Sequence, residues 1–198
     1  MSEKLQQQIR FLMELDKLKS VLRRTLLTHE PRLENSGEHS WHVSVVALIF
    51  AEYANESIDL LRVLKMLLVH DIVEIDAGDV YIYDVQANEG KVERERDAAR
   101  RIFGLLPAEQ AKELLELWEE FEAKATPEAK FAGACDRITP LLHNYHAKGH
   151  SWQEHGIQKH EVIAINQVIE EGSTELWKAA REVIEESVRL GYLAAEST

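Results

Sequence analysis

The dipeptide His70-Asp71 interrupts an apolar run that extends from Lys65 to Ile75. Both side chains are strong metal ligands, and charged groups inside an apolar helix are costly unless they are paired or bound to a metal. Glu74 follows three residues after Asp71, so it projects from nearly the same helical face. The chain must therefore fold so that other segments bring compensating groups to this helix.

Two further segments carry residues of the same chemical types. His39 lies upstream, within Glu34–Ser40, and Asp136 lies downstream, after a run of small and apolar residues. Two imidazoles and two carboxylates from three separate helices would make a mixed nitrogen and oxygen metal site with positions left for water. The candidate ligands are His39, His70, Asp71 and Asp136.

The spacing of apolar residues predicts an all-α protein. Apolar side chains recur every three or four residues along most of the chain, and Thr126-Pro127 is a typical helix start. We expect about eight helices, at about 5–22, 39–54, 59–75, 91–103, from 107 onward, 127–149, 158–171 and 173–190. They would form a single domain over 1–198, with a metal-site core at about 15–145 and the C-terminal helices 158–190 packed on it.

Composition narrows the class of protein. A hydrophobic fraction of 45% in 198 residues is enough for one domain with a substantial core. A net charge of −12 argues against a basic nucleic-acid-binding face. We expect no membrane span and no signal peptide, because the chain lacks the apolar runs that both require. One cysteine, Cys135, is typical of a reducing compartment, so we expect a cytoplasmic protein. We expect its partner to be a small molecule.

The order of the candidate ligands resembles that of the HD-domain metal-dependent phosphohydrolases. The segment His70–Asp79 resembles the HD-x-x-E-x-x-x-G-D block of the branch that includes bacterial 5′-deoxynucleotidases and their eukaryotic HD-domain relatives. Glu34–Ser40 is similar to the first-histidine motif of that branch, Ala129–Asp136 to its last-ligand helix, and Leu114–Phe121 to a further stretch. The resemblance covers roughly residues 15–145 and implies an HD-domain helical bundle.

The resemblance also implies roles for individual residues. One divalent ion would be bound by His39, His70, Asp71 and Asp136. Glu74 would orient or deprotonate the metal-bound water, and Asp79 would support the ligands or protonate the leaving alkoxide. Arg23 aligns with the arginine that holds the substrate phosphate. Arg24 stands where the deoxynucleotidases place a tryptophan close to the sugar, so the resemblance does not extend to selectivity for 2′-deoxyribose.

These residue types suit the hydrolysis of a phosphate monoester. A divalent ion neutralises the anionic phosphate and lowers the pKa of bound water from ~15.7 toward ~7. A guanidinium adds bidentate contacts to phosphate oxygens, and a neighbouring carboxylate supplies a base. We therefore predict a mononuclear metal-dependent phosphohydrolase, with nucleoside 5′-monophosphates as the expected substrates. The ligand set accepts Mn, Co, Fe, Ni, Zn or Mg, and the sequence does not choose among them.

Two other functions remain open. An HD-type nucleoside triphosphohydrolase would need more basic residues around its phosphates than a chain of net charge −12 suggests. A non-catalytic, metal-stabilised binding module would not need Glu74 and Asp79 beside the ion. A binuclear HD centre is disfavoured, because the chain has no histidine between His70 and His143.

The remaining histidines and the C-terminal helices lead to two weaker expectations. His42 lies three residues after His39 and is better explained by packing than by metal binding. His143, His146 and His150 share a face that we expect to be solvated or close to substrate, with His143 as the exception, because it lies seven residues after Asp136 on the same helical face. Apolar residues in the last helices predict a homodimer: Trp177, Val183, Ile184, Val188, Leu190, Tyr192 and Leu193.

Overall fold

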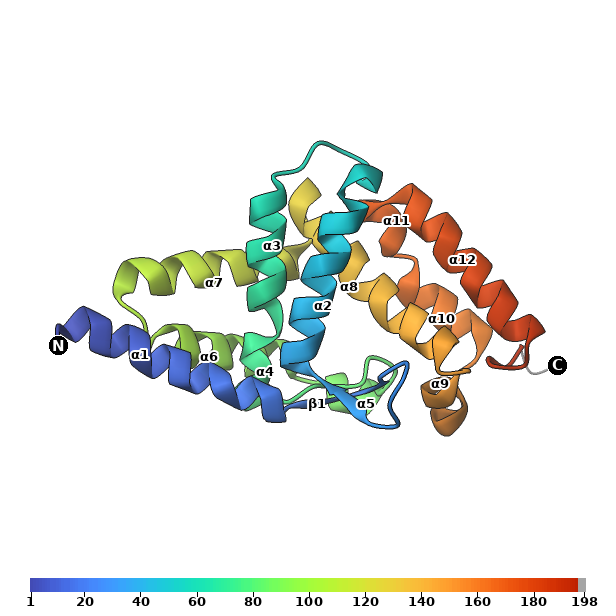
Figure 1. Cartoon of the computed structure of the whole chain (residues 1–198), viewed down its shortest axis with the longest axis horizontal. Coiled ribbons are helices and arrows are strands. Elements are labelled where there is room, and N and C mark those ends of the chain that lie inside the picture. Colours follow the sequence, from blue (N-terminus) through green and yellow to red (C-terminus); the bar gives the residue numbers. More distant parts are fainter. Residues whose placement is uncertain (196–198) are drawn as a thin grey trace.

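The structure, a computed structural model, describes residues 1–195 apart from the side chain of Val85, so the last three residues of the predicted domain lie outside it. Helices make up most of the chain, which confirms the all-α prediction (Figure 1). In chain order the elements are α1 (Glu3–Leu15), η1 (Asp16–Ser20), β1 (Leu22–Leu26), β2 (Leu33–Asn35), α2 (Ser36–Phe50), η2 (Ala51–Tyr53), α3 (Leu60–Val69), η3 (His70–Val73), α4 (Glu74–Ala77), α5 (Val85–Asn88), α6 (Lys91–Phe103), α7 (Ala108–Ala123), α8 (Pro127–His146), α9 (His150–His155), α10 (Lys159–Asn166), α11 (Ile169–Gly172) and α12 (Thr174–Arg189), where η denotes a 3₁₀ helix.

A short antiparallel hairpin, which the sequence did not predict, follows the first helix. We expected that helix to continue to Leu22, but α1 ends at Leu15 and β1 pairs with β2, with Leu22 opposite Asn35 and Leu26 opposite Leu33. The backbone N–H of Ser36 donates to the carbonyl of Val21 at 3.0 Å, which continues the pairing into the start of α2. The partner strand lies several residues further along the chain, so helical spacing alone could not reveal it. Arg23 and Arg24 therefore lie on a strand.

Helix α2 begins three residues earlier than predicted. Asn35 is its N-cap: the Asn35 side chain accepts from the backbone N–H of Glu38 at 3.0 Å, and a Glu38 carboxylate oxygen accepts from the backbone N–H of Asn35 at 3.1 Å. This reciprocal pair is a capping box, which satisfies two donors that the first turn would leave free. The segment Asn35–Gly37, expected to be a turn, instead starts the helix and fixes the position of His39.

The predicted helix at 59–75 is divided into three elements at the His70-Asp71 dipeptide. Asp59 caps α3, with one side-chain oxygen accepting from the backbone of Leu61 at 3.0 Å. At His70 the helix tightens into η3, and α4 then ends at Gly78, whose φ of 74° suits glycine. A 3₁₀ segment within a helix is often found at a functional position. Here it carries both residues of the dipeptide.

Elsewhere the helices agree with the prediction to different degrees. Helix α6 has the predicted limits, and α8 begins at Pro127 with the Thr126 hydroxyl accepting from the backbone of Ala129 at 3.2 Å. The predicted helix at 158–171 is two helices, α10 and α11, and α5 and α9 are additional short helices. A Cβ at Gly172 would lie 2.3 Å from the Lys130 carbonyl oxygen, so a glycine lets α11 pack closely on α8.

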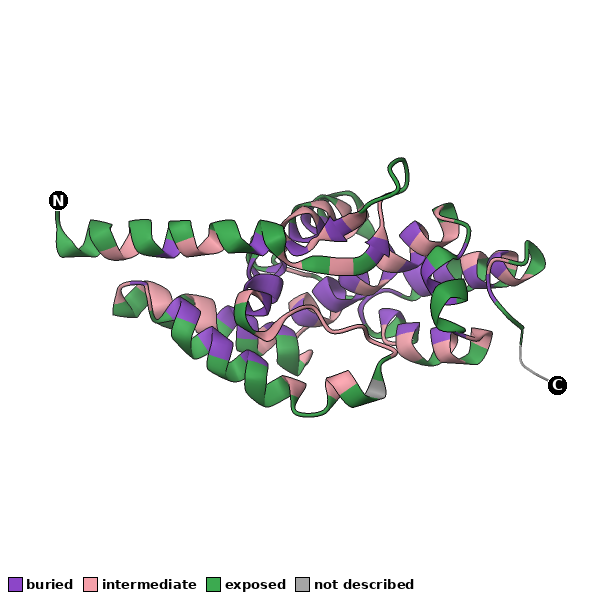
Figure 2. Ribbon diagram, turned by 90° about the horizontal axis from the view of Figure 1, so that it is seen from below, coloured by how far each residue is buried: buried purple, intermediate pink, exposed green. Residues whose placement is uncertain are grey.

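Two apolar clusters flank the segment that carries the dipeptide. Figure 1 shows how the helices that form them are arranged, and Figure 2 shows which parts of the ribbon are buried. The larger lies among α2, α3, α8, α11 and α12 and includes Met66, Phe131 and Ile184, each fully buried. The smaller cluster, which lies among α1, η3, α6 and α7, includes Val73 and Phe103. Because α3 contributes to both clusters and η3 to the smaller one, the charged residues at their junction are held between two packed regions.

The apolar residues used to predict a homodimer largely face the chain's own core. Trp177 is 6% exposed, Ile184 0% and Leu193 2%, whereas Leu190 is 40% exposed. The surface on which that prediction rested is therefore mostly used within the chain. Among the described residues, no helix combines the length and apolar character that crossing a membrane requires.

Candidate metal centre and active site

Three elements bring the predicted metal ligands together. His39 on α2, His70 on η3 and Asp136 on α8 each offer one ligand atom, and these atoms all lie within 4.8 Å of one another. The Nε2 atom of His39 lies 2.9 Å from Asp136 Oδ1, and the Nε2 atom of His70 lies 3.5 Å from the same oxygen. All three residues are buried. The structure thus gathers residues that are 97 positions apart in the chain.

Asp71 completes the group and links it to the hairpin. Its Oδ1 lies 3.0 Å from His70 Nε2, and its Oδ2 accepts from Arg23 Nη1 at 2.8 Å. Arg23 Nη1 is also 3.7 Å from Asp79 Oδ1. The Arg23 side chain is only 13% exposed, so its charge is held among these carboxylates. Arg23 was predicted to contact phosphate, and in this structure its guanidinium orients Asp71.

The carboxylates require positive charge beside them. Burial lowers the pKa of His70, but the charge of Asp71 and the contact with Asp136 outweigh burial and raise that pKa to about 9. Burial raises the pKa of Asp136, but contacts with His39 and His70 hold it well below its ordinary value. Protonated imidazoles therefore supply the positive charge that the buried carboxylates need. A divalent ion would supply the same charge and displace those protons.

The donor atoms fit a divalent ion. The Nδ1 atom of His70 lies 2.8 Å from the Leu67 carbonyl oxygen, so it is placed to donate, which leaves Nε2 as the atom that can bind a metal. His70 Nε2 is buried and has no hydrogen-bond partner among the described residues. It faces two carboxylates and a second imidazole, a set that first-row divalent ions accept.

Glu74 and Asp79 lie beside these ligands in the same pocket. Burial, followed by the charge of Asp71, raises the pKa of Glu74 well above its ordinary value. The hydroxyl of Ser36 donates to Glu74 Oε2 at 2.6 Å, which fixes the carboxyl group. Burial also raises the pKa of Asp79, although Arg23 opposes this. The sequence reasoning missed Ser36, because the segment was interpreted as a turn rather than the first residue of α2.

The pocket beside the ligands has a volume of about 250 Å³ and a mixed lining. Its wall contains the metal-ligand residues His70, Asp71 and Asp136 together with Glu74, Asp79, Arg23 and the exposed Arg24. Three further cations also line it: Lys91, Lys124 and Arg137. Arg137 follows Asp136 directly, a position that could have indicated it. Local positive charge is therefore present in a chain whose net charge is −12.

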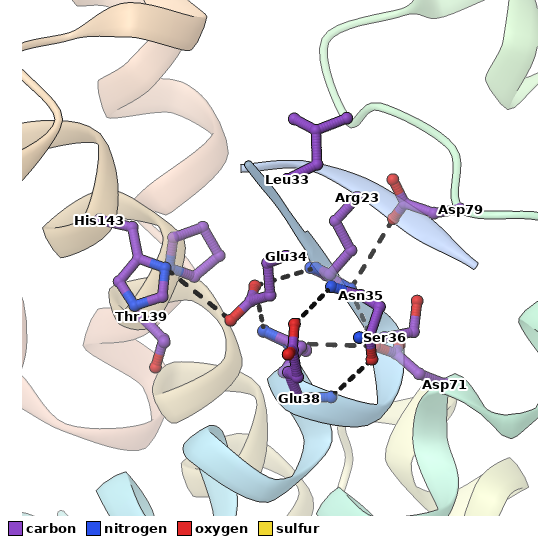
Figure 3. A network of polar contacts seen from close by, with 12 residues as sticks. Arg23, Leu33, Glu34, Asn35, Ser36, Glu38, Asp71, Asp79, Thr139 and His143 are labelled. Carbon is purple, nitrogen blue, oxygen red and sulfur yellow. Dashed lines mark hydrogen bonds and ion pairs between the residues drawn. The ribbon is translucent and has the colours of Figure 1, made fainter. Parts of the chain in front are cut away.

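Glu34 is the most deeply buried carboxylate near the centre, and the sequence reasoning gave it no role. It is 1% exposed and lies on β2 between Arg23 and His143 (Figure 3). Glu34 Oε2 is 3.4 Å from Nδ1 of His39 and 3.6 Å from Nε of Arg23. A carboxylate beside the outer nitrogen of a metal-binding histidine fixes the orientation of the ring. The sequence feature that could have pointed to Glu34 is its place in the motif Glu34–Ser40.

The later histidines divide into buried and exposed ones. His143 is 6% exposed and its ring stacks on that of His42, with centroids 5.1 Å apart. His146 and His150 are exposed, which agrees with the expected solvated face. His143, the exception singled out by its spacing from Asp136, is buried, and Glu34 from a distant strand covers it at 3.9 Å. The carboxylate beside this histidine comes from β2.

The fold and the site define a helical domain with a buried centre of two histidines and two aspartates. The sequence matches the HD domain family over residues 15–177, and the chain belongs to that family. Among curated relatives, human 5′-deoxynucleotidase HDDC2 is 34% identical over 111 residues, which cover 56% of this chain and 53% of that protein. The mouse protein of the same name is 33% identical over 135 residues, covering 68% and 66%. This chain therefore spans only half to two thirds of these relatives' length.

Solved structures show the same fold. A protein described as a predicted metal-dependent phosphohydrolase, from Magnetospirillum magnetotacticum MS-1, is 51% identical, with a TM-score of 0.92 and 96% of both chains covered. A conserved hypothetical protein from Pyrococcus furiosus is 24% identical with a TM-score of 0.63, which supports the fold alone. The resemblance inferred from the sequence motifs is confirmed at the level of the family.

Proposed function

We propose that this chain is a metal-dependent phosphohydrolase that cleaves phosphate monoesters, with nucleoside 5′-monophosphates as substrates. The observation that carries the proposal is the unpartnered, buried Nε2 atom of His70, which faces the carboxylates of Asp71 and Asp136 in the wall of a pocket. The names of the curated relatives and of the structural neighbour support the same activity. The proposed metal ligands are His39, His70, Asp71 and Asp136.

The other residues of the pocket would divide the remaining tasks. When bound, the divalent ion would neutralise substrate charge and lower the pKa of a coordinated water. Glu74 would accept the proton of the attacking water, with Ser36 holding one of its oxygens. Asp79, whose pKa is raised mainly by burial, would be suited to give a proton to the leaving alkoxide. Arg23 would hold Asp71 and Asp79 in place and contact the phosphate with its remaining donors.

The substrate's phosphate and sugar would meet the cations of the pocket wall. Lys91, Lys124 and Arg137 line the pocket and could contact phosphate oxygens. Arg24 also lines it and is exposed, so it could lie beside the sugar. We propose that preference between ribose and deoxyribose depends on Arg24, since the deoxynucleotidases that the sequence resembles carry a tryptophan there.

Release of inorganic phosphate from dAMP and AMP tests this function. The protein is assayed after chelation and again after restoring Mn²⁺, Co²⁺ or Zn²⁺, with dATP as a third substrate. Phosphate release from monophosphates that depends on the restored ion supports the proposal. Arg24→Ala should change the ratio of dAMP to AMP turnover while retaining hydrolysis of both.

The same assay separates the alternative functions. Release of triphosphate from dATP without turnover of dAMP would identify a triphosphohydrolase. The cations at Lys91, Lys124 and Arg137 are the observation that keeps this alternative open. Retained metal without turnover of any of these nucleotides would favour a metal-stabilised binding module.

A homodimer in the cytoplasm remains a proposal with a new structural basis. Four exposed apolar side chains lie on one side of α2: Trp41 at 65%, Val45 at 36%, Leu48 at 50% and Ile49 at 65%. A second copy of the chain could cover this face. Light scattering at micromolar concentration tests the assembly, and a monomer mass would contradict it.

The single cysteine, Cys135, is buried and its thiol pKa is raised by burial, which is compatible with a reducing compartment.

A further inference from the structure

A second group of potential metal ligands lies behind the first. Glu34 on β2, His42 on α2 and His143 on α8 each offer one ligand atom, and these atoms all lie within 4.8 Å of one another. Figure 3 shows Glu34 and His143 directed toward each other from their separate elements. Among the described residues, none of the three belongs to the wall of the pocket described above. The group is therefore a separate cluster within the same fold.

Two members of this cluster are buried without the hydrogen bonds that they need. Glu34 is 1% exposed and His143 is 6% exposed, and neither Oε2 of Glu34 nor Nδ1 of His143 has a hydrogen-bond partner among the described residues. Buried polar atoms are almost always satisfied, so each exception calls for a partner. Glu34 Oε1 and His143 Nδ1 are 3.9 Å apart, too far for a hydrogen bond. A group between these two atoms would give His143 Nδ1 its missing partner and would bind the Glu34 oxygen that faces it.

The separation and the atom types suit a metal ion in that place. Two ligands of a tetrahedral ion, with bonds of about 2.0–2.2 Å, lie about 3.4 Å apart. The 3.9 Å gap would need to close by only about 0.5 Å. Two imidazoles and one carboxylate are a ligand set that Zn²⁺, Co²⁺, Ni²⁺ and Fe²⁺ accept, with a fourth position for water. Alkaline-earth ions prefer all-oxygen sites and would bind less well.

The protonation states favour binding as well. Burial lowers the pKa of His143, which favours the neutral imidazole that a metal requires. His42 is half-buried and its ring stacks on that of the exposed Trp41, with centroids 6.1 Å apart. It therefore provides a route by which an ion could enter from solvent.

Glu34 connects this cluster to the first. One of its oxygens faces His143, and the other lies 3.4 Å from Nδ1 of His39, whose Nε2 is 2.9 Å from Asp136. The imidazole of His39 thus spans the distance between the two clusters. A cation bound to Glu34 would draw electron density from the carboxylate and weaken its interaction with Nδ1 of His39. An ion bound by Glu34, His42 and His143 would then alter how strongly His39 binds the ion at the pocket.

We propose that Glu34, His42 and His143 bind a second divalent transition-metal ion, separate from the pocket and coupled to it through His39. This ion would be additional to the single ion proposed at the pocket, and it would not form a binuclear centre with it. Its ligands come from β2, α2 and α8, so it would also tie the hairpin to the helical core. The proposal does not require the chain to hydrolyse any particular substrate.

Metal content of the purified protein tests this proposal. The wild-type chain, His42→Gln, His143→Gln, Asp71→Asn and the double variant His42→Gln/Asp71→Asn are stripped with chelator, loaded with Zn²⁺ or Co²⁺, dialysed and analysed for metal per chain. We expect two ions in wild type, one in each single variant and none in the double variant. His146→Gln, an exposed histidine on the same helix as His143, is the matched control and should keep two ions.

The cobalt form provides a second readout. Loss of the ion bound by Glu34, His42 and His143 in the His42→Gln variant should remove one of two sets of Co²⁺ absorption bands. Asp71→Asn should remove the other set. One ion in wild type, with none in Asp71→Asn, would overturn the proposal. Two ions in both His42→Gln and His143→Gln would overturn it too. His42 is half-buried rather than buried, so its substitution tests binding without removing a core residue.

Discussion

Two ion pairs of nearly equal length show how differently the same chemistry is used in two regions of this molecule. At the metal centre, His39 Nε2 lies 2.9 Å from Asp136 Oδ1, and the two side chains are 0% and 10% exposed. Between the outer faces of α3 and α7, Lys65 Nζ lies 2.7 Å from Glu113 Oε1, with side chains 47% and 53% exposed. The distances alone would suggest equal importance.

Burial accounts for the difference between the two regions. Exposed pairs are screened by water and lose side-chain entropy, so most contribute little to stability. Removing one partner of a buried pair leaves an uncompensated charge, which is strongly destabilising. The buried pair can remain only if further positive charge is close to its carboxylates, and the proposed divalent ion would provide it. Solvent exposure, rather than the length of the pair, therefore indicates which charges are functional.

The largest effect should come from a metal ligand. Asp71→Asn keeps the shape of the side chain but removes its charge, so the ion should be lost from the pocket. Since a bound ion contributes several kcal/mol to transition-state stabilisation, activity should fall about 10³–10⁵-fold. Metal analysis and phosphate release measure both effects. Asp97→Asn, at a side chain 78% exposed, is the control and should behave as wild type. Full activity with retained metal in Asp71→Asn would refute the ligand assignment.

The next effect separates the proposed base from the ligands. Glu74→Gln keeps the size of the side chain and one acceptor for Ser36 but removes the base. We expect the ion to be retained and kcat to fall about 10²–10⁴-fold, the usual contribution of a positioned acid or base. Elemental analysis alongside steady-state kinetics tests this. If the variant instead lost the ion, and excess metal restored turnover, Glu74 would be a ligand.

Metal removal should lower stability as well as activity. An ion that binds only the folded state at 100 times its dissociation constant stabilises that state by about 2.7 kcal/mol. For a chain of this size we expect chelation to lower Tm by about 5–10 °C, followed by scanning calorimetry. Asp71→Asn should respond less to chelator than wild type. An unchanged Tm in chelated wild-type protein, with metal loss confirmed, would contradict the prediction.

The partly buried ion pair between Lys91 and Glu95 extends the comparison, because its contribution to stability should depend on pH. Glu95 is 6% exposed and lies 3.4 Å from Lys91, and burial raises its pKa although Lys91 opposes this. Because the folded state holds this proton more tightly than the unfolded state, Glu95 contributes less stability as pH rises from about 4.5 through its folded pKa. Glu95→Gln should therefore raise stability at pH 8 relative to pH 5, by on the order of 1 kcal/mol. An equal effect of the substitution at both pH values would contradict this origin.

The smallest effect is expected at the exposed pair. Glu113→Gln removes the contact with Lys65, which is screened by solvent, so Tm should change by less than about 2 °C. Activity and metal content should be those of wild type. A loss of stability comparable to that of Asp71→Asn would show that burial does not distinguish the two regions.

The sequence predicted the centre better than its surroundings. His70-Asp71 in an apolar helix, with His39 and Asp136 on other helices, was sufficient to identify the cluster that the structure brings together. Local spacing identified α6 and the start of α8 correctly, because caps and helical faces depend on residues within about one turn. The same reasoning extended the first helix to Leu22 and predicted no strand after it, although β1, which carries Arg23 and Arg24, pairs with a strand further along the chain.

By itself, the sequence determined the helical class and the chemical types of the metal-binding groups, since both follow from residue identity and short-range spacing. Only the tertiary structure decided which of these side chains contact one another. It placed Glu34 of β2 between His39 and His143, set the Ser36 hydroxyl against Glu74, and directed Arg23 to Asp71. The physical reason is that such contacts depend on how distant segments pack around the core, and no local pattern encodes that packing.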